Sequence, residues 1–242
     1  MMNAERFRAR LGCALCGAVM LLPSYAAAAD TDAEDAAGLG NHQKNIRVDL
    51  GFRTQFVKDA DFDAFSERDA LHQVSVGASW AFWASGKLSL AGVAGFDYGK
   101  TSATLRSDDA RLGVARFVLA PEARYHLLRV LAVTAKLGPT LTREAATVSG
   151  GLDTELSRKA WRFGFDATAG VAVELAGYAS GRSDKPRLWL TAEGGYGWTA
   201  PMRLVLKPSE ADAAPQRLAP LALGDLSLGG PLFRITAALS FW

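Results

Sequence analysis

The chain has few side chains of the types that perform catalysis or hold metal ions. Its histidines, His42, His72 and His126, are widely separated, and both cysteines, Cys13 and Cys16, lie near the N-terminus. A structural metal site needs several such ligands at one place. We expect no metal and no cofactor.

One grouping of residues has the composition of a nucleophilic site. Ser66, Glu67 and Ser75 lie close in sequence to His72, whereas His126 has carboxylate and arginine neighbours but no serine. A histidine that contacts a serine and a carboxylate can activate the hydroxyl, as some lipid-modifying barrel enzymes do. Sequence proximity does not supply that contact. We therefore predict that the chain is not an enzyme and keep a lipid-modifying enzyme as an alternative.

The first 29 residues are typical of a secretory signal peptide. Arg6, Arg8 and Arg10 precede an apolar run, and small residues follow it at 26–29. The apolar run is too short to cross a bilayer as a helix. Cleavage removes both cysteines, which excludes disulfides, and leaves 24 basic and 24 acidic residues. We expect no nucleic-acid partner from so balanced a chain.

Residues 30–44 form an acidic lead-in without periodicity, and residues 45–242 carry the strand signature, in which apolar and polar side chains alternate. Eight segments show this period of two: Ile46–Phe56, Gln73–Phe82, Leu88–Tyr98, Ala115–Tyr125, Leu131–Leu141, Trp161–Leu175, Leu188–Trp198 and Phe233–Phe241. The predicted loops at 58–70, 100–112, 142–160 and 202–229 are long, and those at 84–87 and 126–129 are short. This alternation of loop lengths favours an all-β, eight-stranded antiparallel up-and-down transmembrane β-barrel.

Side-chain size decides which face of the barrel is apolar. An eight-stranded barrel has an interior just wide enough for side chains to fill, so it cannot enclose all the aromatic rings of the alternating set. The rings should face lipid and form two girdles at the two interfaces. The predicted girdle residues are Phe56, Phe96, Tyr98, Trp161, Phe163, Tyr196 and Trp198 at the long-loop end, and Trp80, Phe82, Tyr125, Trp189 and Phe241 at the short-turn end.

The opposite face of the segments contains small and hydroxyl side chains together with charges of both signs. These charges should line the lumen, where they can pair with one another. The predicted polar network of the lumen, which either fills the barrel or gates a narrow pore, comprises Arg47, Asp49, Arg53, Arg116, Glu122, Arg124, Lys136, Arg162, Asp166, Glu174, Glu193 and Arg234.

The chain resembles the eight-stranded outer-membrane barrels of the OmpA membrane-domain and OmpX type from Asn45 to Trp242. The resemblance rests on the alternating strands, on the segment Leu119–Tyr125 and on the C-terminal strand. In that family the assembly machinery reads a terminal aromatic residue with apolar residues at alternate positions before it. The resemblance implies an assembly signal at Phe233, Ile235, Leu239, Phe241 and Trp242. Trp242 directly follows Phe241 and so falls outside the alternating apolar positions.

These observations predict a monomeric outer-membrane protein with an envelope-structural or surface-interaction role and, as a further possibility, a narrow pore. Its expected partners are outer-membrane lipids, lipopolysaccharide and the barrel-assembly machinery. A soluble periplasmic barrel that binds an apolar ligand is the remaining alternative, because alternation alone does not say which face is inside.

Overall fold

The computed structural model describes residues 46–105, 108–149, 155–176, 186–208 and 221–241. The predicted signal peptide, the lead-in, His42 and Trp242 lie outside these residues. Within them, no helix is long and apolar enough to cross a membrane.

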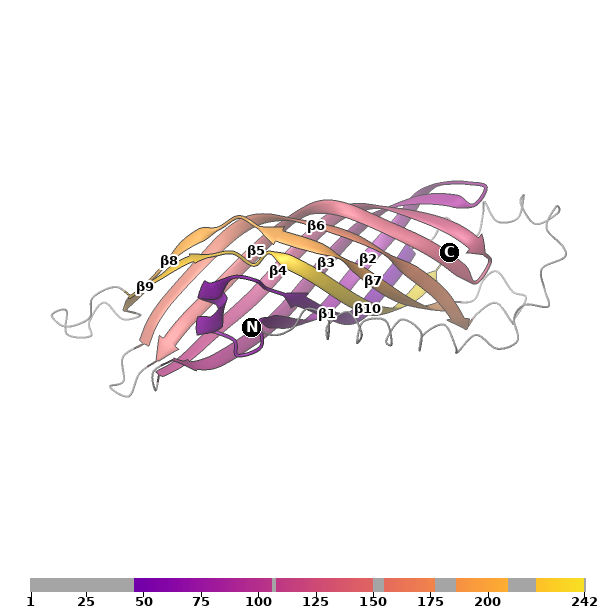
Figure 1. The fold of residues 1–242 in the computed structure, drawn as a ribbon. Coiled ribbons are helices and arrows are strands. Elements are labelled where there is room, and N and C mark those ends of the chain that lie inside the picture. The colour runs from indigo at the N-terminus through magenta and orange to yellow at the C-terminus, as the bar shows by residue number, and fades with distance from the viewer. Residues whose placement is uncertain (1–45, 106–107, 150–154, 177–185, 209–220, 242) are drawn as a thin grey trace, which may run out of the picture. The chain divides into compact units, whose positions relative to one another are not determined.

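Eight antiparallel strands form a closed ring (Figure 1). The strands are β1 (Ile46–Phe56), β2 (Ala70–Ser85), β3 (Leu88–Leu105), β4 (Asp108–Leu128), β5 (Leu131–Ser149), β6 (Glu155–Ala176), β7 (Arg187–Thr199) and β10 (Gly230–Phe241). Each of these strands pairs with the next in this order, and β10 pairs with β1 to close the ring. The eight predicted segments each fall within one of these strands, which confirms the predicted eight-stranded up-and-down barrel.

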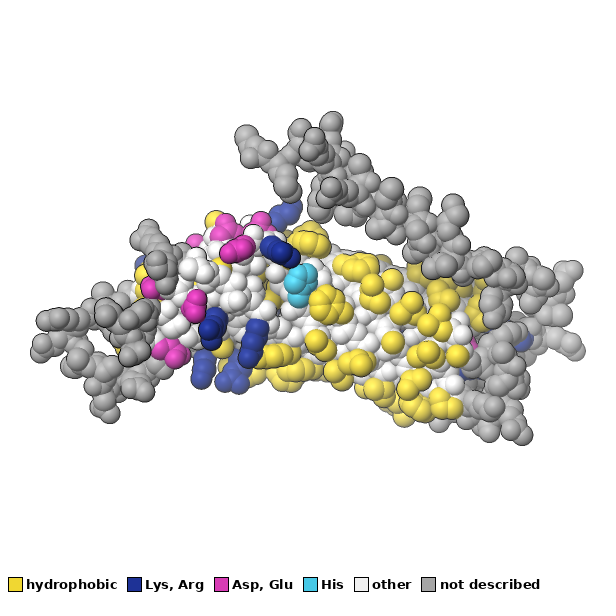
Figure 2. All heavy atoms as spheres, turned by 90° about the horizontal axis from the view of Figure 1, so that it is seen from below, with side chains coloured by type: hydrophobic (Ala, Val, Ile, Leu, Met, Phe, Trp, Pro, Cys, Tyr) yellow, Lys and Arg dark blue, Asp and Glu magenta, His cyan; other side chains and the backbone are white. Residues whose placement is uncertain are grey.

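The barrel is apolar outside and polar inside. Trp80 is 62% exposed and Leu119 is 64% exposed, whereas Arg53 and Arg116 are completely buried. This is the reverse of a water-soluble protein, in which arginine is almost never fully buried. A broad hydrophobic band covers the face of the barrel in Figure 2. The strands therefore cross a membrane, and the alternative of a soluble barrel with an apolar interior is wrong.

The two ends of the barrel differ. At one end the β2–β3 and β4–β5 turns are tight, and Ile46 pairs with Phe241, so β1 begins and β10 ends there. Outer-membrane barrels place their short turns in the periplasm and their longer connections outside the cell. We call the opposite end, where β3 to β6 extend furthest, the outer end.

The predicted loops at 100–112 and 142–160 are wrong over most of their length. β3 continues to Leu105, β4 starts at Asp108, β5 continues to Ser149 and β6 starts at Glu155. The reason is that the alternation reverses beyond the aromatic girdle. In this extension, apolar side chains face inward and polar ones face outward, because water replaces lipid as the outer solvent.

A small apolar core fills the outer end of the barrel. The 202–229 connection, which we predicted as a loop, contains two short strands, β8 (Met202–Pro208) and β9 (Leu221–Leu226), which pair with each other and join β6. A 3₁₀ helix, η2 (Ala60–Ala64), packs against β9 and β3. We name this core the outer plug; its buried residues are Val57, Phe62, Phe65, Leu71, Ala110, Leu112, Val114, Ala146, Val148, Leu204, Leu206, Leu226 and Leu228.

Candidate functional site

The lumen of the barrel holds the candidate site. The twelve charged residues that we predicted for it all lie on the inward face of their strands: nine are buried, and Asp49, Lys136 and Arg234 line an internal cavity. The side chains reach this face through strict alternation, since every second residue of a strand points the same way.

The arginine at the centre of the outer half of the lumen connects three strands. Arg53 of β1 places its Nη1 2.8 Å from Asp97 Oδ2 of β3 and 2.8 Å from Asp166 Oδ2 of β6. Arg116 of β4 approaches the other Asp166 oxygen, with Nη1–Oδ1 at 3.0 Å. Both arginines are fully buried. These ion pairs span the lumen from wall to wall.

Asp97 is a buried charged residue of the lumen that our network prediction omitted. Its Oδ2 also lies 2.8 Å from Arg234 Nη2, and its Oδ1 accepts a 2.5 Å hydrogen bond from Ser75 Oγ. Asp97 lies at one of the inward-facing positions of β3, and this position in the alternating pattern could have identified it from the sequence. A carboxylate with two arginines and a hydroxyl keeps its lone pairs satisfied in a low-dielectric interior.

A second group of ion pairs occupies the level nearer the short turns. Lys136 Nζ lies 2.5 Å from Glu193 Oε1 and 3.5 Å from Glu122 Oε2. Arg124 pairs with Glu122 through Nε and donates a 2.6 Å hydrogen bond to Ser79 Oγ. Four strands are linked in this way, and each carboxylate has at least one cation beside it.

Little open space remains between the two groups of ion pairs. The cavity there measures about 40 Å³, and its lining includes Arg47, Asp49 and Thr191. A buried water needs roughly 10–15 Å³ of such volume, so the cavity has room for only a few waters. The side chains around this cavity therefore leave room for no more than a few waters between the two groups of ion pairs.

The polar network and the outer plug are joined by hydrogen bonds. Arg162 pairs with Glu144 and donates to the carbonyl oxygens of Ala200 and Leu226. Glu144 is a buried carboxylate that the prediction missed, because residues 142–160 were predicted to form a loop. Gln55 Nε2 donates a 2.6 Å hydrogen bond to the Leu228 carbonyl. These bonds hold the chain around β9 across the barrel mouth.

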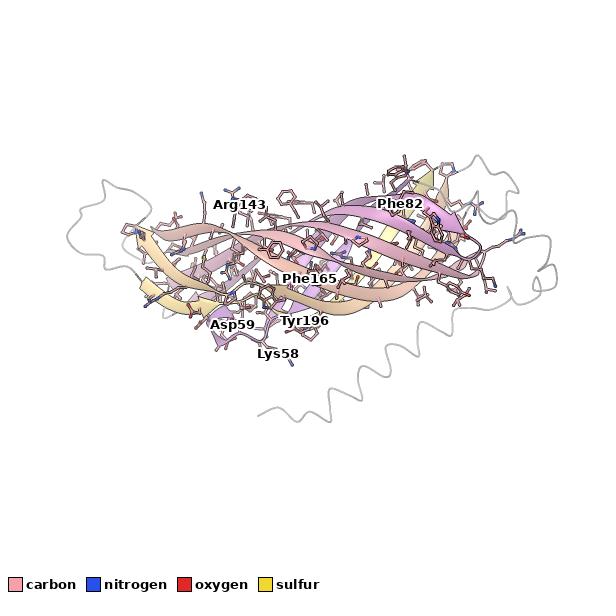
Figure 3. All side chains as sticks on the ribbon, turned by 90° about the horizontal axis from the view of Figure 1, so that it is seen from above. Lys58, Asp59, Phe82, Arg143, Phe165 and Tyr196 are labelled. Carbon is pink, nitrogen blue, oxygen red and sulfur yellow. The ribbon has the colours of Figure 1, made fainter. Side chains whose placement is uncertain are left out.

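The η2 segment is attached to the same part of the chain. The Asp59 carboxylate caps η2 by accepting from the Asp61 amide and also accepts from the Ser227 amide at 2.7 Å. Figure 3 shows Asp59 and Lys58 at this end of the barrel. Two connections that are distant in sequence thus close the mouth together.

Trp189 was wrongly placed in the girdle of the short-turn end. It is 3% exposed and lies in the lumen, where Nε1 donates to Ser240 Oγ at 3.2 Å and the Arg47 guanidinium lies 5.0 Å from the ring centroid. The residue has the inward parity of Thr191 and Glu193. The His126 ring packs edge-on against its indole, with the ring centroids 6.3 Å apart.

The other predicted girdle residues face outward. Their exposed fractions lie between 36% for Phe96 and 62% for Trp80. Trp83, which the sequence analysis missed, is also 42% exposed, because a bulge between Ala81 and Trp83 turns two successive rings outward. The rings remain at two levels, one near each end of the hydrophobic band.

Two residues of the possible nucleophilic site, His72 and Ser75, do not come together. His72 is exposed on the outer face of β2, where it contacts Thr54 Oγ1 at 3.0 Å and stacks on Phe52. Ser75 faces the lumen and is committed to Asp97. The serine and the histidine therefore lie on opposite sides of the barrel wall.

The residues of the implied assembly signal lie on one face of β10. Phe233, Ile235, Leu239 and Phe241 are each between 41% and 46% exposed on the lipid side. Their use as a recognition signal stays a prediction, since it concerns the unfolded chain before assembly.

No protein-family model matches the chain. No curated protein matches it either. Among solved structures, the chain is similar to Ail, the attachment invasion locus protein of Yersinia pestis, in complex with the heparin analogue sucrose octasulfate, at 9% identity and a TM-score of 0.43, covering 82% of this chain and 98% of Ail.

Two further structures show a weaker likeness. Neisserial surface protein A is 14% identical with a TM-score of 0.38, covering 81% of this chain and 95% of that protein. The outer-membrane protease OmpT from Escherichia coli is 9% identical with a TM-score of 0.29, covering 82% and 97%. The assignment of a transmembrane barrel rests on the closed strand ring and the exposed apolar band of the chain itself.

Proposed function

We propose that the chain is a non-enzymatic outer-membrane protein whose barrel is a sealed anchor and whose outer end serves an envelope-structural or surface-interaction role. The observation that carries the proposal is the double closure of the lumen. Cross-barrel ion pairs fill its middle, and the outer plug fills its mouth.

The ion pairs of the lumen and the apolar outer plug close the barrel in different ways, which supports a structural role of the lumen network and not a gating role. Arg53, Arg116 and Lys136 each pair with a carboxylate from another strand, so moving one of them leaves a buried charge without its partner at a cost of several kcal/mol. The outer plug is apolar and excludes water from the mouth. Opening a path requires both to rearrange.

The outer extension supports the surface-interaction part of the proposal. β3, β4, β5 and β6 continue past the girdle residue Tyr98 with polar side chains outward, including Ser102, Arg111 and Thr147. A barrel that only filled space in the membrane would not need this projecting, water-facing sheet. Specificity in such proteins lies in their exposed connections.

Conductance in a planar bilayer tests the sealed barrel. We expect no current steps from the unaltered protein, and none from the Arg47→Ala or Glu193→Ala variants, because the outer plug stays in place. Steps from the unaltered protein would show a pore. Steps that appear only in a variant would assign a gating role to the network.

Lipid analysis tests the absence of catalysis. We expect lipid A mass spectra of a deletion strain to equal those of the parent strain. A difference that the complementing gene restores, and that a His72→Ala version does not restore, would support the lipid-modifying enzyme.

Membrane fractionation tests the location. We expect the protein in the outer-membrane fraction, soluble only in detergent. Recovery in the periplasmic fraction without detergent would contradict the proposal.

A further inference from the structure

We propose that the outward face of β3 to β6, just above the aromatic girdle, is a cradle that binds the phosphate groups of a phosphorylated lipid headgroup in the outer leaflet. The inference rests on the proposed orientation of the barrel and deepens the proposed function by naming a partner. We call this surface the basic cradle; its cations are Lys100, Arg111, Arg143 and Lys159.

The strand register places the four cations around one spot. Lys100 of β3 is followed across the sheet by Gly113, Ala145 and Lys159 in a single row. Neighbouring strands lie about 4.8 Å apart, so the two lysines stand on either side of a floor about 14 Å wide. Both are exposed and have the length to bend over that floor.

The two arginines close the other sides of the cradle. Arg143 lies in the row nearer the membrane, beside Ala115, and Arg111 lies in the row further out, between Ser102 and Thr147. Arg143 projects away from the barrel wall in Figure 3. Two cations along the strands and two across them leave an anion surrounded on four sides.

The floor of the cradle is hollow because its residues are small. A groove of about 870 Å³ lies there, lined by the side chains around Gly113, Ala115 and Ala145. A bulky residue at any of these positions would fill the space between the cations. Small floor residues under long basic side chains make a receptacle of headgroup size.

No carboxylate competes for the cations within these three rows of β3 to β6. The nearest acidic neighbours in the register are Asp109 and Glu155, both one row further out, and Asp109 Oδ2 lies 3.5 Å from Arg111 Nη2. The side chains of Asp109 and Arg111 are both more than 60% exposed, and such surface pairs contribute little. The cradle therefore has a surplus of positive charge.

Two of the cations are held at the level of the membrane interface. Lys100 Nζ lies 5.8 Å from the centre of the Tyr98 ring, and the Arg143 guanidinium lies 5.9 Å from the centre of the Trp161 ring. Tyrosine and tryptophan rings sit at the headgroup level of a bilayer. On the face in Figure 2, Lys and Arg side chains, with Asp and Glu further out among them, lie where the hydrophobic band ends.

An apolar surface continues directly below the cradle. The next row of outward-facing residues on the membrane side of the cradle consists of Phe96, Phe117, Leu141 and Phe163. The ring centres of Phe96 and Phe117 are 5.0 Å apart, so these rings form a packed face. A ligand that is anionic above and hydrocarbon below matches both surfaces, which favours a phosphorylated lipid over a soluble anion.

The binding of lipid to the purified, refolded mature chain in detergent tests this inference. The probes are a diphosphorylated lipid A and the same lipid after removal of its phosphates, titrated and counted by native mass spectrometry. The variants are Lys100→Ala, Arg143→Ala and Gly113→Phe. A Cβ on Gly113 meets nothing closer than 3.8 Å, so phenylalanine fills the floor without disturbing the strand.

Matched controls come from the same barrel. Lys87→Ala removes an exposed lysine at the short-turn end, and Gly92→Phe adds a ring to the lipid-facing wall at a glycine whose Cβ would meet nothing within 4 Å. Heat-modifiable migration on a gel checks that each variant is folded.

We expect tighter binding of the phosphorylated probe, and a loss of about fivefold for each alanine variant, as for one basic residue near an anionic surface. Gly113→Phe should weaken binding at least as much, added salt should weaken it further, and the controls should not. Equal binding of both probes would overturn the inference. So would unchanged binding in the variants, or displacement of the lipid by inorganic pyrophosphate. These results do not depend on conductance, so failure here leaves the sealed barrel standing.

Discussion

Asp97 contacts three polar side chains of the lumen from three different strands. It pairs with Arg53 and Arg234 and accepts from Ser75. Removing one partner from a buried ion pair costs more than the pair contributes to folding, because the charges left behind lose their compensation. The two arginines are therefore the side chains most affected by a change at Asp97.

We expect Asp97→Ala to lower the free energy of unfolding by about 3–5 kcal/mol, since it leaves two arginines in the lumen with fewer partners. Denaturant unfolding of the barrel in bilayers measures this. Asp109→Ala is the control: the carboxylate is 62% exposed and its surface pair is worth about 0–1 kcal/mol. Equal effects of the two substitutions would contradict a structural role for the network.

At the scale of single residues, parity within a strand predicted the lumen side chains well. The prediction left out Asp97 and put Trp189 on the wrong side, although both follow the parity of their neighbours. A tryptophan suggests a girdle by its type, yet here the indole fills the lumen and hydrogen-bonds to Ser240. The prediction for Trp189 relied on the residue type, whereas its position in the alternating pattern of β7 gives the correct side of the barrel wall.

At the scale of elements, the outer parts of β4 and β5 show why the strand ends were predicted too short. Leu112, Val114, Ala146 and Val148 face inward there, whereas the inward residues of the membrane-spanning part are largely polar. The period of two continues, but its polarity reverses where lipid gives way to water. A search for one constant apolar face ends the strand at that reversal.

The adjacent glycines of β7 provide a matched test of close strand packing. A Cβ on Gly195 would lie 2.0 Å from the Ala167 carbonyl oxygen, whereas a Cβ on Gly194 would meet nothing within 4 Å. We expect Gly195→Ala to destabilise the barrel by about 1–3 kcal/mol through overpacking and Gly194→Ala to have little effect. Unfolding in bilayers compares the two, and a larger effect at Gly194 would contradict the close approach of Gly195 to β6.

The outer plug should open without unfolding the barrel. Phe65 is completely buried in it, and a change of buried phenylalanine to alanine costs about 3–5 kcal/mol. η2 is a short element outside the strand ring, so we expect Phe65→Ala to cause local opening.

Hydrogen exchange measures this opening. Faster exchange is expected at the amides of Val57 and Ser227, which bond to Asp69 and Asp59, and slow exchange should persist in β4 and β5. The control is Phe163→Ala, whose ring is 59% exposed. Uniformly faster exchange in all strands would contradict an independent plug.

At the scale of the whole molecule, the barrel has three parts along its axis: the short-turn end, the membrane-spanning part and the outer extension. Trp189 lies in the lumen near the tight turns, ion pairs fill the membrane-spanning part beneath an apolar outer wall, and the outer plug fills a water-facing extension. The ring of eight strands followed from the sequence because the alternation of apolar and polar side chains is a local signal. The plug did not, since it is built from η2, β8 and β9, which are short and meet only in the folded chain.

The central claim is that the wall of the barrel is apolar toward lipid and that the charged face is inside. Quenching of tryptophan fluorescence by lipids brominated along their acyl chains tests it most directly. The proteins are variants that keep one tryptophan each, Trp80, Trp161 or Trp189, with the others changed to phenylalanine. We expect strong quenching of Trp80 and Trp161, which are 62% and 55% exposed on the lipid side, and little quenching of Trp189, which is 3% exposed in the lumen. Strong quenching of Trp189, with Trp80 and Trp161 protected, would contradict the claim.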